Sequence, residues 1–216
     1  TDNLGRDILS RVLEGAGTTL TIAVFTVTAG AFFGILAGAF TGYYGGPIDN
    51  ILMRICDTIT AFPSFLLALV IVSVLGSGKY NVVIALGLLF IPSFARIVRG
   101  EYARATTQAY VDNARLMGAG PLRIMFVHIL PNIRGVLLSA IAIGFNNAVL
   151  AEASMSYLGI GVQPPDPSLG RMLSEAQNYL LSAPWFAIST GVVMILLILG
   201  FTLLGEGLSK EAGRNA

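Results

Sequence analysis

Cysteine, histidine and charge are all scarce in this 216-residue chain, and each shortage excludes a class of protein. The single cysteine, Cys56, excludes an intrachain disulfide, and the single histidine, His128, leaves no cluster of ligands for a metal ion. Charged residues make up 12% of the chain, against about 25% in an ordinary soluble domain. The net charge of +1 provides no basic stripe for a phosphate backbone, so we expect neither a metal site nor a nucleic-acid partner.

Apolar residues, by contrast, are abundant. They make up 55% of the chain, and the mean hydropathy is +0.77. A soluble fold of 22.8 kDa cannot bury this much apolar surface, so we expect membrane lipid to be its solvent, which excludes a cytosolic enzyme and a disordered region. Backbone polar groups in lipid must be satisfied within their own segment. The composition therefore predicts an all-α integral membrane protein.

Five runs with little or no charge are long enough to cross a bilayer, which takes about 20 residues. They lie at about 18–42, 51–78, 80–99, 135–157 and 185–206. The second span would carry Arg54 and Asp57 in its first turns. The third reaches full length if Arg96 and Arg99 extend their side chains toward the lipid headgroups.

The lysines and arginines fall into two unequal groups on opposite sides of these spans. The larger group contains Arg54, Arg96, Arg99, Arg104, Arg115, Arg123, Arg134, Lys210 and Arg214. The smaller group contains Arg6, Arg11, Lys79 and Arg171. Positive residues are enriched on the cytoplasmic side, which places segment 96–134 and the C-terminus there, and residues 1–11 and 158–183 outside. Five spans with an external N-terminus lead us to expect a sixth helix upstream.

Within the external loop 158–183, apolar residues recur at helical spacing. They are Leu169, Met172, Leu173, Ala176 and Leu180, with Arg171, Glu175 and Gln177 between them. The pattern predicts an amphipathic helix that lies against the bundle or at the membrane interface. An irregular loop that covers the bundle is the alternative.

The polar segment 100–131 separates the third and fourth spans. Its alanines favour a helix as far as Met117. Gly118 and Gly120 then favour a helix end, because glycine adopts the left-handed conformation that closes a C-terminus. Pro121 suits the first position of a new helix, where its missing N–H costs nothing. We therefore predict a helix, a sharp turn and a second helix that face the cytoplasm.

A glycine repeat marks the first span. Gly30, Gly34, Gly38 and Gly42 recur every four residues and so share one helix face. Small residues at this spacing let two helix backbones approach closely in lipid. Static helix packing is the favoured interpretation, and a sliding or gating seam is the alternative.

Polar side chains inside the spans are candidates for a solute pathway. Glu152, with Asn146 and Asn147 about 1.5 turns before it, interrupts the fourth span, and a buried ionisable group usually faces a cavity or a partner. A hydrogen bond between helices is the equal alternative for Glu152. Asp57 is the fourth candidate, although a local ion pair with Arg54 is favoured there. Pro63 is expected to kink the same helix.

Three motifs resemble a known transporter family. The first reads Asp112-Asn113-Ala114, three residues, Gly118, nine residues, His128-Ile129-Leu130-Pro131. It resembles the cytoplasmic signature of ATP-binding-cassette importer permeases and departs from it at Asp112, Asn113 and His128, of which Asp112 keeps the carboxylate. The others are Leu4-Gly-Arg-Asp-Ile-Leu-Ser-Arg11 and Ser156-Tyr-Leu-Gly-Ile-Gly-Val-Gln-Pro-Pro165. Together they resemble the C-type permease subunit of the dipeptide, oligopeptide and nickel branch.

The resemblance implies a type I permease fold in which residues 1–216 form one transmembrane domain of a six-span chain. It implies a heterodimer with a second permease subunit, two cytosolic ATP-binding subunits that use ATP and Mg, and an extracytoplasmic substrate-binding protein. The membrane would be the cytoplasmic (inner) membrane of a prokaryote. The turn would be the coupling helix that docks in the ATPase. The residues implied in coupling are Asp112, Asn113, Ala114, Arg115, Gly118, Ala119, Gly120 and Pro121.

The chain has no phosphate-binding loop of its own. The nearest candidate, Gly76-Ser-Gly78-Lys79-Tyr80, lacks both the spacing and the final hydroxyl residue, so we expect no directly bound cofactor and no enzyme activity. The predicted function is a permease that imports peptides or related small solutes, nickel included. An ion-coupled secondary transporter and a non-conducting membrane scaffold are the alternatives.

Overall fold

The computed structural model describes residues 1–2 and 5–214, with side chains described through Gly207 and at Lys210. Leu4 of the Leu4–Arg11 motif and the side chain of Arg214 lie outside the described residues. Every regular element in the described part is helical. The elements are α1 (Ile8–Tyr44), α2 (Gly46–Thr60), α3 (Ser64–Leu75), α4 (Lys79–Ala105), α5 (Ala109–Leu116), α6 (Pro121–Arg123), the π-helix η1 (Ile124–Ile129), α7 (Leu130–Asn132), α8 (Arg134–Tyr157), α9 (Leu169–Gln177) and α10 (Pro184–Arg214).

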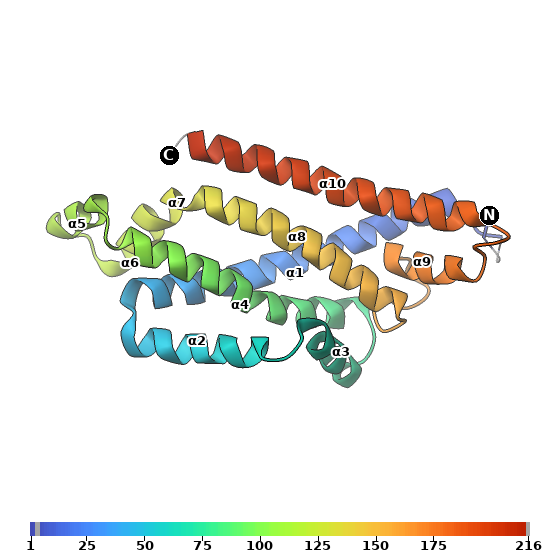
Figure 1. The fold of residues 1–216 in the computed structure, drawn as a ribbon, viewed down its shortest axis with the longest axis horizontal. Coiled ribbons are helices and arrows are strands. Elements are labelled where there is room, and N and C mark those ends of the chain that lie inside the picture. Colours follow the sequence, from blue (N-terminus) through green and yellow to red (C-terminus); the bar gives the residue numbers. More distant parts are fainter. Residues whose placement is uncertain (3–4, 215–216) are drawn as a thin grey trace.

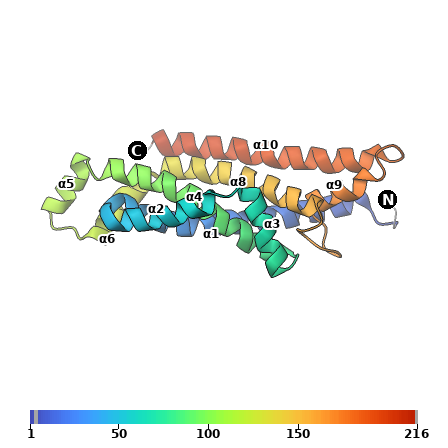
Figure 2. The same ribbon diagram turned by 60° about the horizontal axis from the view of Figure 1, so that its bottom comes forward.

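Long helices run side by side along the molecule, with α2 beside α4 (Figures 1 and 2). In the described part, four of them, α1, α4, α8 and α10, are long and apolar enough to cross a membrane. The pair α2 and α3 also qualifies when the two are taken together, which makes up to five spans. The prediction of an all-α membrane protein with five spans is confirmed at this level.

The second predicted span is not one kinked helix. It begins at Gly46 instead of Ile51, and α2 meets α3 at an angle of 84°. The bend falls at Pro63, the expected position, with φ −55° and ψ 117° in extended geometry just before α3. Proline disfavours helical geometry in the residue before it and supplies no N–H, so the chain turns there far more sharply than the sequence suggested.

The four repeated glycines of α1 lie against α4. A Cβ atom placed on Gly30 would lie 2.6 Å from Phe90 Cβ. At Gly38 it would lie 2.5 Å from the carbonyl oxygen of Ala95. Gly34 and Gly42 approach the next turns of α4 in the same way. The helices therefore touch at the level of their backbones, which is the geometry expected of static packing.

The two ends of the bundle differ in what they carry. In Figure 1, α5, α6, α7 and the C-terminus lie at one end, and the N-terminus and α9 lie at the other. The two groups of positive residues are expected on opposite sides of the spans, and this arrangement agrees with that expectation. The end with the larger positive group is called the coupling end below, and the opposite one is called the outer end.

Segment 158–183 does contain a helix, and this helix packs inward. Helix α9 begins after Ser168, whose side chain accepts a hydrogen bond from the Arg171 backbone N–H. Leu169 and Met172 on its apolar face are fully buried. The helix contacts α8 and α10, so its apolar face lies against the bundle, one of the two positions expected for it. Leu180, expected in the same helix, lies beyond its end and is half-exposed.

Candidate functional site

The coupling end is built around a tight turn. Helix α5 ends at Leu116, and Gly118 has φ +81°, the left-handed conformation that favours glycine. The Ala119 N–H donates to the carbonyl oxygen of Ala114 at 3.0 Å and so closes the helix end. Pro121 then begins α6. The predicted order of helix, glycine turn and proline start is present.

The helix before this turn is shorter than expected. The alanine-rich run predicts one helix as far as Met117, but α4 ends at Ala105 and α5 begins only at Ala109. Gln108 adopts extended geometry between them, with φ −90° and ψ 144°. The break redirects the chain, so that Val111 and Ala114 pack onto the same core as Tyr102. Burial of these side chains therefore overrides the helix propensity of the linker.

The tip of the segment is apolar and open to solvent. Leu116 and Met117 are 87% and 86% exposed, and Leu122 across the turn is 59% exposed. The base below is rigid, because the Tyr102 hydroxyl donates to the Met125 carbonyl oxygen at 2.9 Å in a fully buried position. Exposed apolar residues on a fixed base are typical of a protein-binding surface.

Asp112 does not join the two helices of the turn. Its carboxylate pairs with Arg115 of its own helix at 3.1 Å, and both side chains are well exposed. Arg115 also lies 5.9 Å from the ring centre of Tyr43, at the end of α1. Asn113 is exposed beside them. These polar side chains therefore border the apolar tip and do not cover it.

The π-helix that follows was not predicted from the sequence. Residues Ile124–Ile129 form wider turns before Pro131, where a continuous α-helix was expected. A proline inside a helix clashes with the carbonyl four residues earlier, here that of Val127, and wider turns relieve this clash. Pro131 in the motif was the residue from which these wider turns could have been predicted.

Glu152 is enclosed by the chain itself. It is fully buried, and its Oε1 accepts a hydrogen bond from the Ser156 hydroxyl at 2.6 Å. The Ser156 oxygen in turn accepts from the Val162 N–H at 3.0 Å. Among the described residues, Oε2 has no hydrogen-bond partner. Glu152 thus ties the outer end of α8 to the loop after it and lines none of the hollows described below. This geometry favours a structural role for Glu152 over a place in the solute pathway.

The two asparagines point in different directions. The Asn146 amide donates to the Thr202 hydroxyl at 2.8 Å and so joins α8 to α10. Asn147 is exposed and lines a groove of about 370 Å³ between α4, α8 and the start of α3, called the central groove below. Ser64 and Ser93 add two hydroxyls to its lining, which is otherwise apolar except for glycine. Of the candidates in α8, Asn147 therefore has the geometry expected of a pathway residue.

A second hollow of about 280 Å³ lies between α2 and α4 and is almost entirely polar. It is called the charged cavity below. Its lining is Asp49, Asn50, Met53, Arg54, Asp57, Arg96 and Arg99.

Two expectations about these charges are wrong. Asp57 pairs with Arg96 of α4 at 2.9 Å instead of with its helix neighbour Arg54. Arg96 and Arg99 reach across to α2 instead of extending toward headgroups: Arg99 donates two hydrogen bonds to Asp49, at 2.5 and 2.6 Å. The carboxylates of α2 face α4, and a pair between helices satisfies both charges without contact with lipid.

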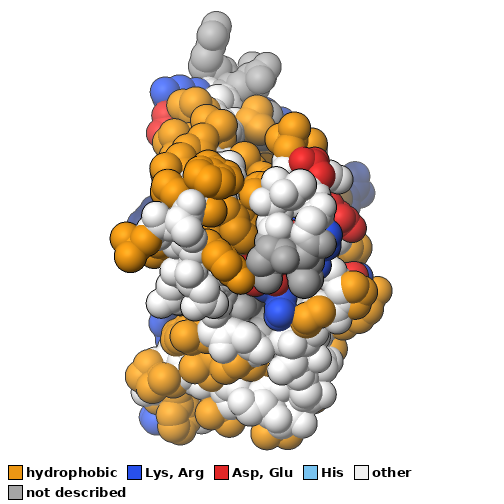
Figure 3. All heavy atoms as spheres, turned by 90° about the vertical axis from the view of Figure 1, so that its right-hand side faces the viewer, with side chains coloured by type: hydrophobic (Ala, Val, Ile, Leu, Met, Phe, Trp, Pro, Cys, Tyr) orange, Lys and Arg blue, Asp and Glu red, His pale blue; other side chains and the backbone are white. Residues whose placement is uncertain are grey.

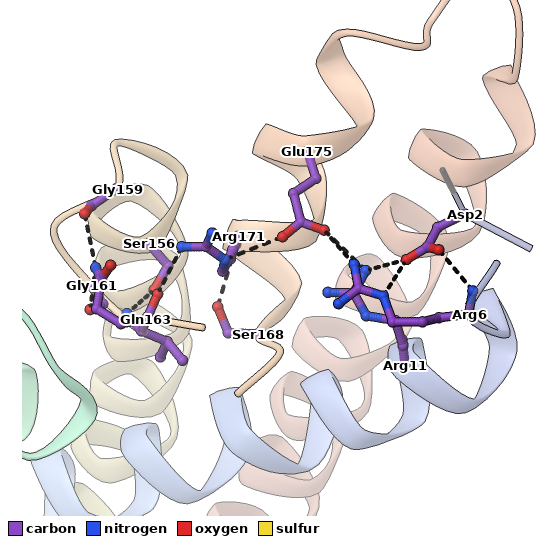
Figure 4. A network of polar contacts seen from close by, with 11 residues as sticks. Asp2, Arg6, Arg11, Ser156, Gly159, Gly161, Gln163, Ser168, Arg171 and Glu175 are labelled. Carbon is purple, nitrogen blue, oxygen red and sulfur yellow. Dashed lines mark hydrogen bonds and ion pairs between the residues drawn. The ribbon is translucent and has the colours of Figure 1, made fainter. Parts of the chain in front are cut away.

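The outer end carries an ion-pair network that was not predicted from the sequence (Figure 4). Arg11 Nη1 lies 2.9 Å from both Asp2 and Glu175, and Arg6 pairs with Asp2 at 2.7 Å. Glu175 also accepts from Arg171 at 3.2 Å. The network joins the start of α1 to α9. Seen from this end, charged side chains are few among the apolar ones (Figure 3).

Residues 30–212 match the model of a family described as binding-protein-dependent transport system inner membrane component. The glutathione transport system permease protein GsiD of Escherichia coli O6:K15:H31 is 45% identical over 207 residues, which cover 96% of this chain and 68% of that protein. GsiD of Pectobacterium atrosepticum is 42% identical over 207 residues, which cover 96% and 69%.

Solved structures share the fold at lower identity. The inward facing MetNI methionine ABC transporter has a TM-score of 0.78 at 18% identity, covering 94% of this chain and 97% of that one. An amino acid ABC transporter crystallised with histidines has a TM-score of 0.74 at 20% identity, covering 95% and 99%. These likenesses concern the arrangement of the helices.

Proposed function

We propose, from the premise that this chain belongs to the family of binding-protein-dependent transport system inner membrane components, that it imports short peptides of about the size of glutathione. The chain is a permease subunit, and its family membership sets aside the ion-coupled transporter and the scaffold. Hydrolysis of ATP, with Mg, belongs to partner subunits. The membrane is the inner membrane of a prokaryote.

In this proposal residues 1–216 form one permease domain that pairs with a second permease subunit. An external binding protein delivers the solute at the outer end, where loop 158–183 lies. Two ATP-binding subunits dock at the coupling end, on segment 100–131 and beside the C-terminus. The glycine repeat from Gly30 to Gly42 holds α1 and α4 together while other helices move.

The observation that carries the proposal is the exposed tip at Leu116, Met117 and Leu122. Among the described residues these side chains are largely uncovered, while the residues beneath them are packed on a buried core. A surface of this kind transmits movement only when a partner holds it. An ATPase that hydrolyses nucleotide at a distance from the solute requires such a contact.

The test uses the complete transporter in membranes, with its binding protein supplied. Leu116→Glu places a charge at a side chain that is 87% exposed, so insertion should be normal while ATPase retention falls at least tenfold, as for loss of an interface hot spot. Gly118→Val adds backbone strain of about 1–2 kcal/mol because φ is positive, and should uncouple hydrolysis from uptake. Asp112→Arg should have a milder effect.

Gly17→Val is the matched control, because a Cβ atom there meets nothing within 4 Å and lies far from the tip. It should retain the ATPase and transport normally. Normal ATPase retention and uptake by both Leu116→Glu and Gly118→Val would contradict the coupling role.

A further inference from the structure

The charged cavity contains one positive charge without an internal partner. Arg96 is paired with Asp57, and Arg99 is paired with Asp49. Arg54 lies between these two aspartates along α2, and among the residues that the structure describes its guanidinium group makes no hydrogen bond or ion pair. The lining therefore has three arginines against two aspartates, and the excess charge lies on an exposed side chain.

The charged cavity lies next to the central groove, on an adjoining face of α4. Ser93 and Ile97 line the groove, and Arg96, within one turn of both, lines the cavity. Across the bend, Ser64 of the groove follows Thr60, whose hydroxyl accepts a hydrogen bond from Arg96 at 2.6 Å. Figures 1 and 2 show α2 beside α4, between α3 and the coupling end. A solute that leaves the groove toward the coupling end meets the cavity next.

The donors left over in the cavity suit a carboxylate. Arg99 uses two N–H groups in a fork on Asp49, whereas Arg96 uses only Nη2 for its bonds to Asp57 and Thr60. Nε and Nη1 of Arg96 and the whole guanidinium group of Arg54 remain available. Guanidinium groups bind carboxylates with paired, charge-assisted hydrogen bonds.

We infer that Arg54, together with the free N–H groups of Arg96, binds the carboxylate of the solute as it leaves the central groove. The inference rests on the proposed function and identifies the substrate class more closely: a small solute with a free carboxylate, such as the C-terminus of a short peptide. Asp49 and Asp57 keep the other two arginine charges balanced, so the solute is held by one excess charge and released again.

The experiment measures ATP-dependent uptake by the complete transporter in proteoliposomes with its binding protein. The probes are radiolabelled glutathione and dialanine, each compared with its C-terminal amide. Arg54→Gln should slow uptake of the acids about tenfold, the low end of the effect of a hydrogen bond to a charged group, and change uptake of the amides less than twofold. The contribution of the binding protein is the same in every variant and cancels in this ratio.

Two further variants distinguish loss of the Arg54 charge from a disturbance of the structure. Arg54→Lys keeps the cation and should retain most of the acid uptake. Thr58→Ala changes an exposed side chain of the same helix that does not line the cavity, and should leave uptake of both probe classes unchanged. Each variant is first checked for a complete set of subunits and an unchanged melting temperature.

The outcomes are distinct. Equal losses for acids and amides with Arg54→Gln would assign Arg54 a structural role, and unchanged acid uptake would show that the cavity binds no carboxylate; either result overturns the inference alone. If the wild-type complex takes up none of the four probes, the proposed function fails and the inference fails with it.

Discussion

Helix α4 is held on one face by the backbone of α1 and on another by two ion pairs from α2, and these attachments differ in kind. On the side of α1, the four glycines have no side chains to separate the two helices, and Ala95 and Val98 of α4 are fully buried there. Against α2, the side chains of Asp57 and Arg96 remain 64% and 46% exposed.

The difference shows which helices form the rigid part of this permease. Fourteen of the 37 residues of α1 are buried, whereas Cys56 is the single buried residue among the 15 of α2. Backbone contact allows no sliding without a clash, because interiors are close-packed. An exposed ion pair such as Asp57–Arg96 contributes about 0–1 kcal/mol and re-forms at small cost, whereas the two-bond pair of Arg99 with the mostly buried Asp49 is the firmer contact of α2. We therefore expect α1 and α4 to move as one body and α2 to move relative to them.

The largest effect is expected at the seam between α1 and α4. In Gly38→Leu the new Cβ atom would lie 2.5 Å from the Ala95 carbonyl oxygen and 2.7 Å from Val98 Cβ, so the helices must separate. Overpacking of this severity costs about 3 kcal/mol or more. We expect little monodisperse complex on gel filtration, and a lower melting temperature in what remains.

Gly17→Leu in the same helix meets nothing within 4 Å and serves as its control. A shift in melting temperature of less than 2 °C corresponds to a change in stability below about 1 kcal/mol. If both variants melt within 2 °C of the wild type, the seam is not rigid.

An intermediate effect is expected for the buried acid. Glu152→Ala leaves the Ser156 hydroxyl without its acceptor in a fully buried position, which costs about 1–3 kcal/mol. Asp57→Ala removes an acid that is 64% exposed and should cost less than about 1 kcal/mol. Thermal unfolding of the purified complex measures both.

Glu152→Gln keeps an acceptor for Ser156 and should restore most of the stability. If it instead lowers uptake while stability and assembly stay normal, Glu152 belongs to the pathway after all.

The smallest effect is expected for the pair between α2 and α4. A double-mutant cycle with Asp57→Asn and Arg96→Gln should give a coupling energy of about 0.2–1 kcal/mol, falling as salt rises, because both side chains are about half-exposed or more. A salt-independent coupling above about 2 kcal/mol would mean that α2 is fixed as firmly as α1, and the contrast between the two faces of α4 would disappear.

Much of the fold followed from the sequence because lipid imposes a simple rule. Backbone groups in the bilayer must be satisfied locally, so long apolar runs become helices, and α1, α4, α8 and α10 lie where those runs are. The turn at Gly118 and Pro121 was also predictable, since each residue has a backbone conformation that few others share. The order of these elements at the coupling end therefore required no tertiary information.

The candidate site was only partly predictable. Spacing alone placed Asp57 beside Arg54, yet the structure pairs Asp57 with Arg96, 39 residues away. In the same way, Glu152 and Asn147 are both polar residues of one span, but Glu152 is enclosed and Asn147 faces the central groove. Helical periodicity tells which residues share a face; it does not tell which neighbour, cavity or solvent that face meets.

By itself, the sequence determined the class of the protein, the positions of its four long apolar helices and the chemistry of its coupling turn, because hydropathy and backbone preferences act locally. The tertiary structure alone decided the 84° bend between α2 and α3, the choice of α4 as the partner of the glycine seam, and the ion pairs of Asp49 and Asp57 that leave Arg54 without a partner among the described residues. Each of these depends on which helices become neighbours. That choice is set by packing between segments distant in the chain, which no local pattern records.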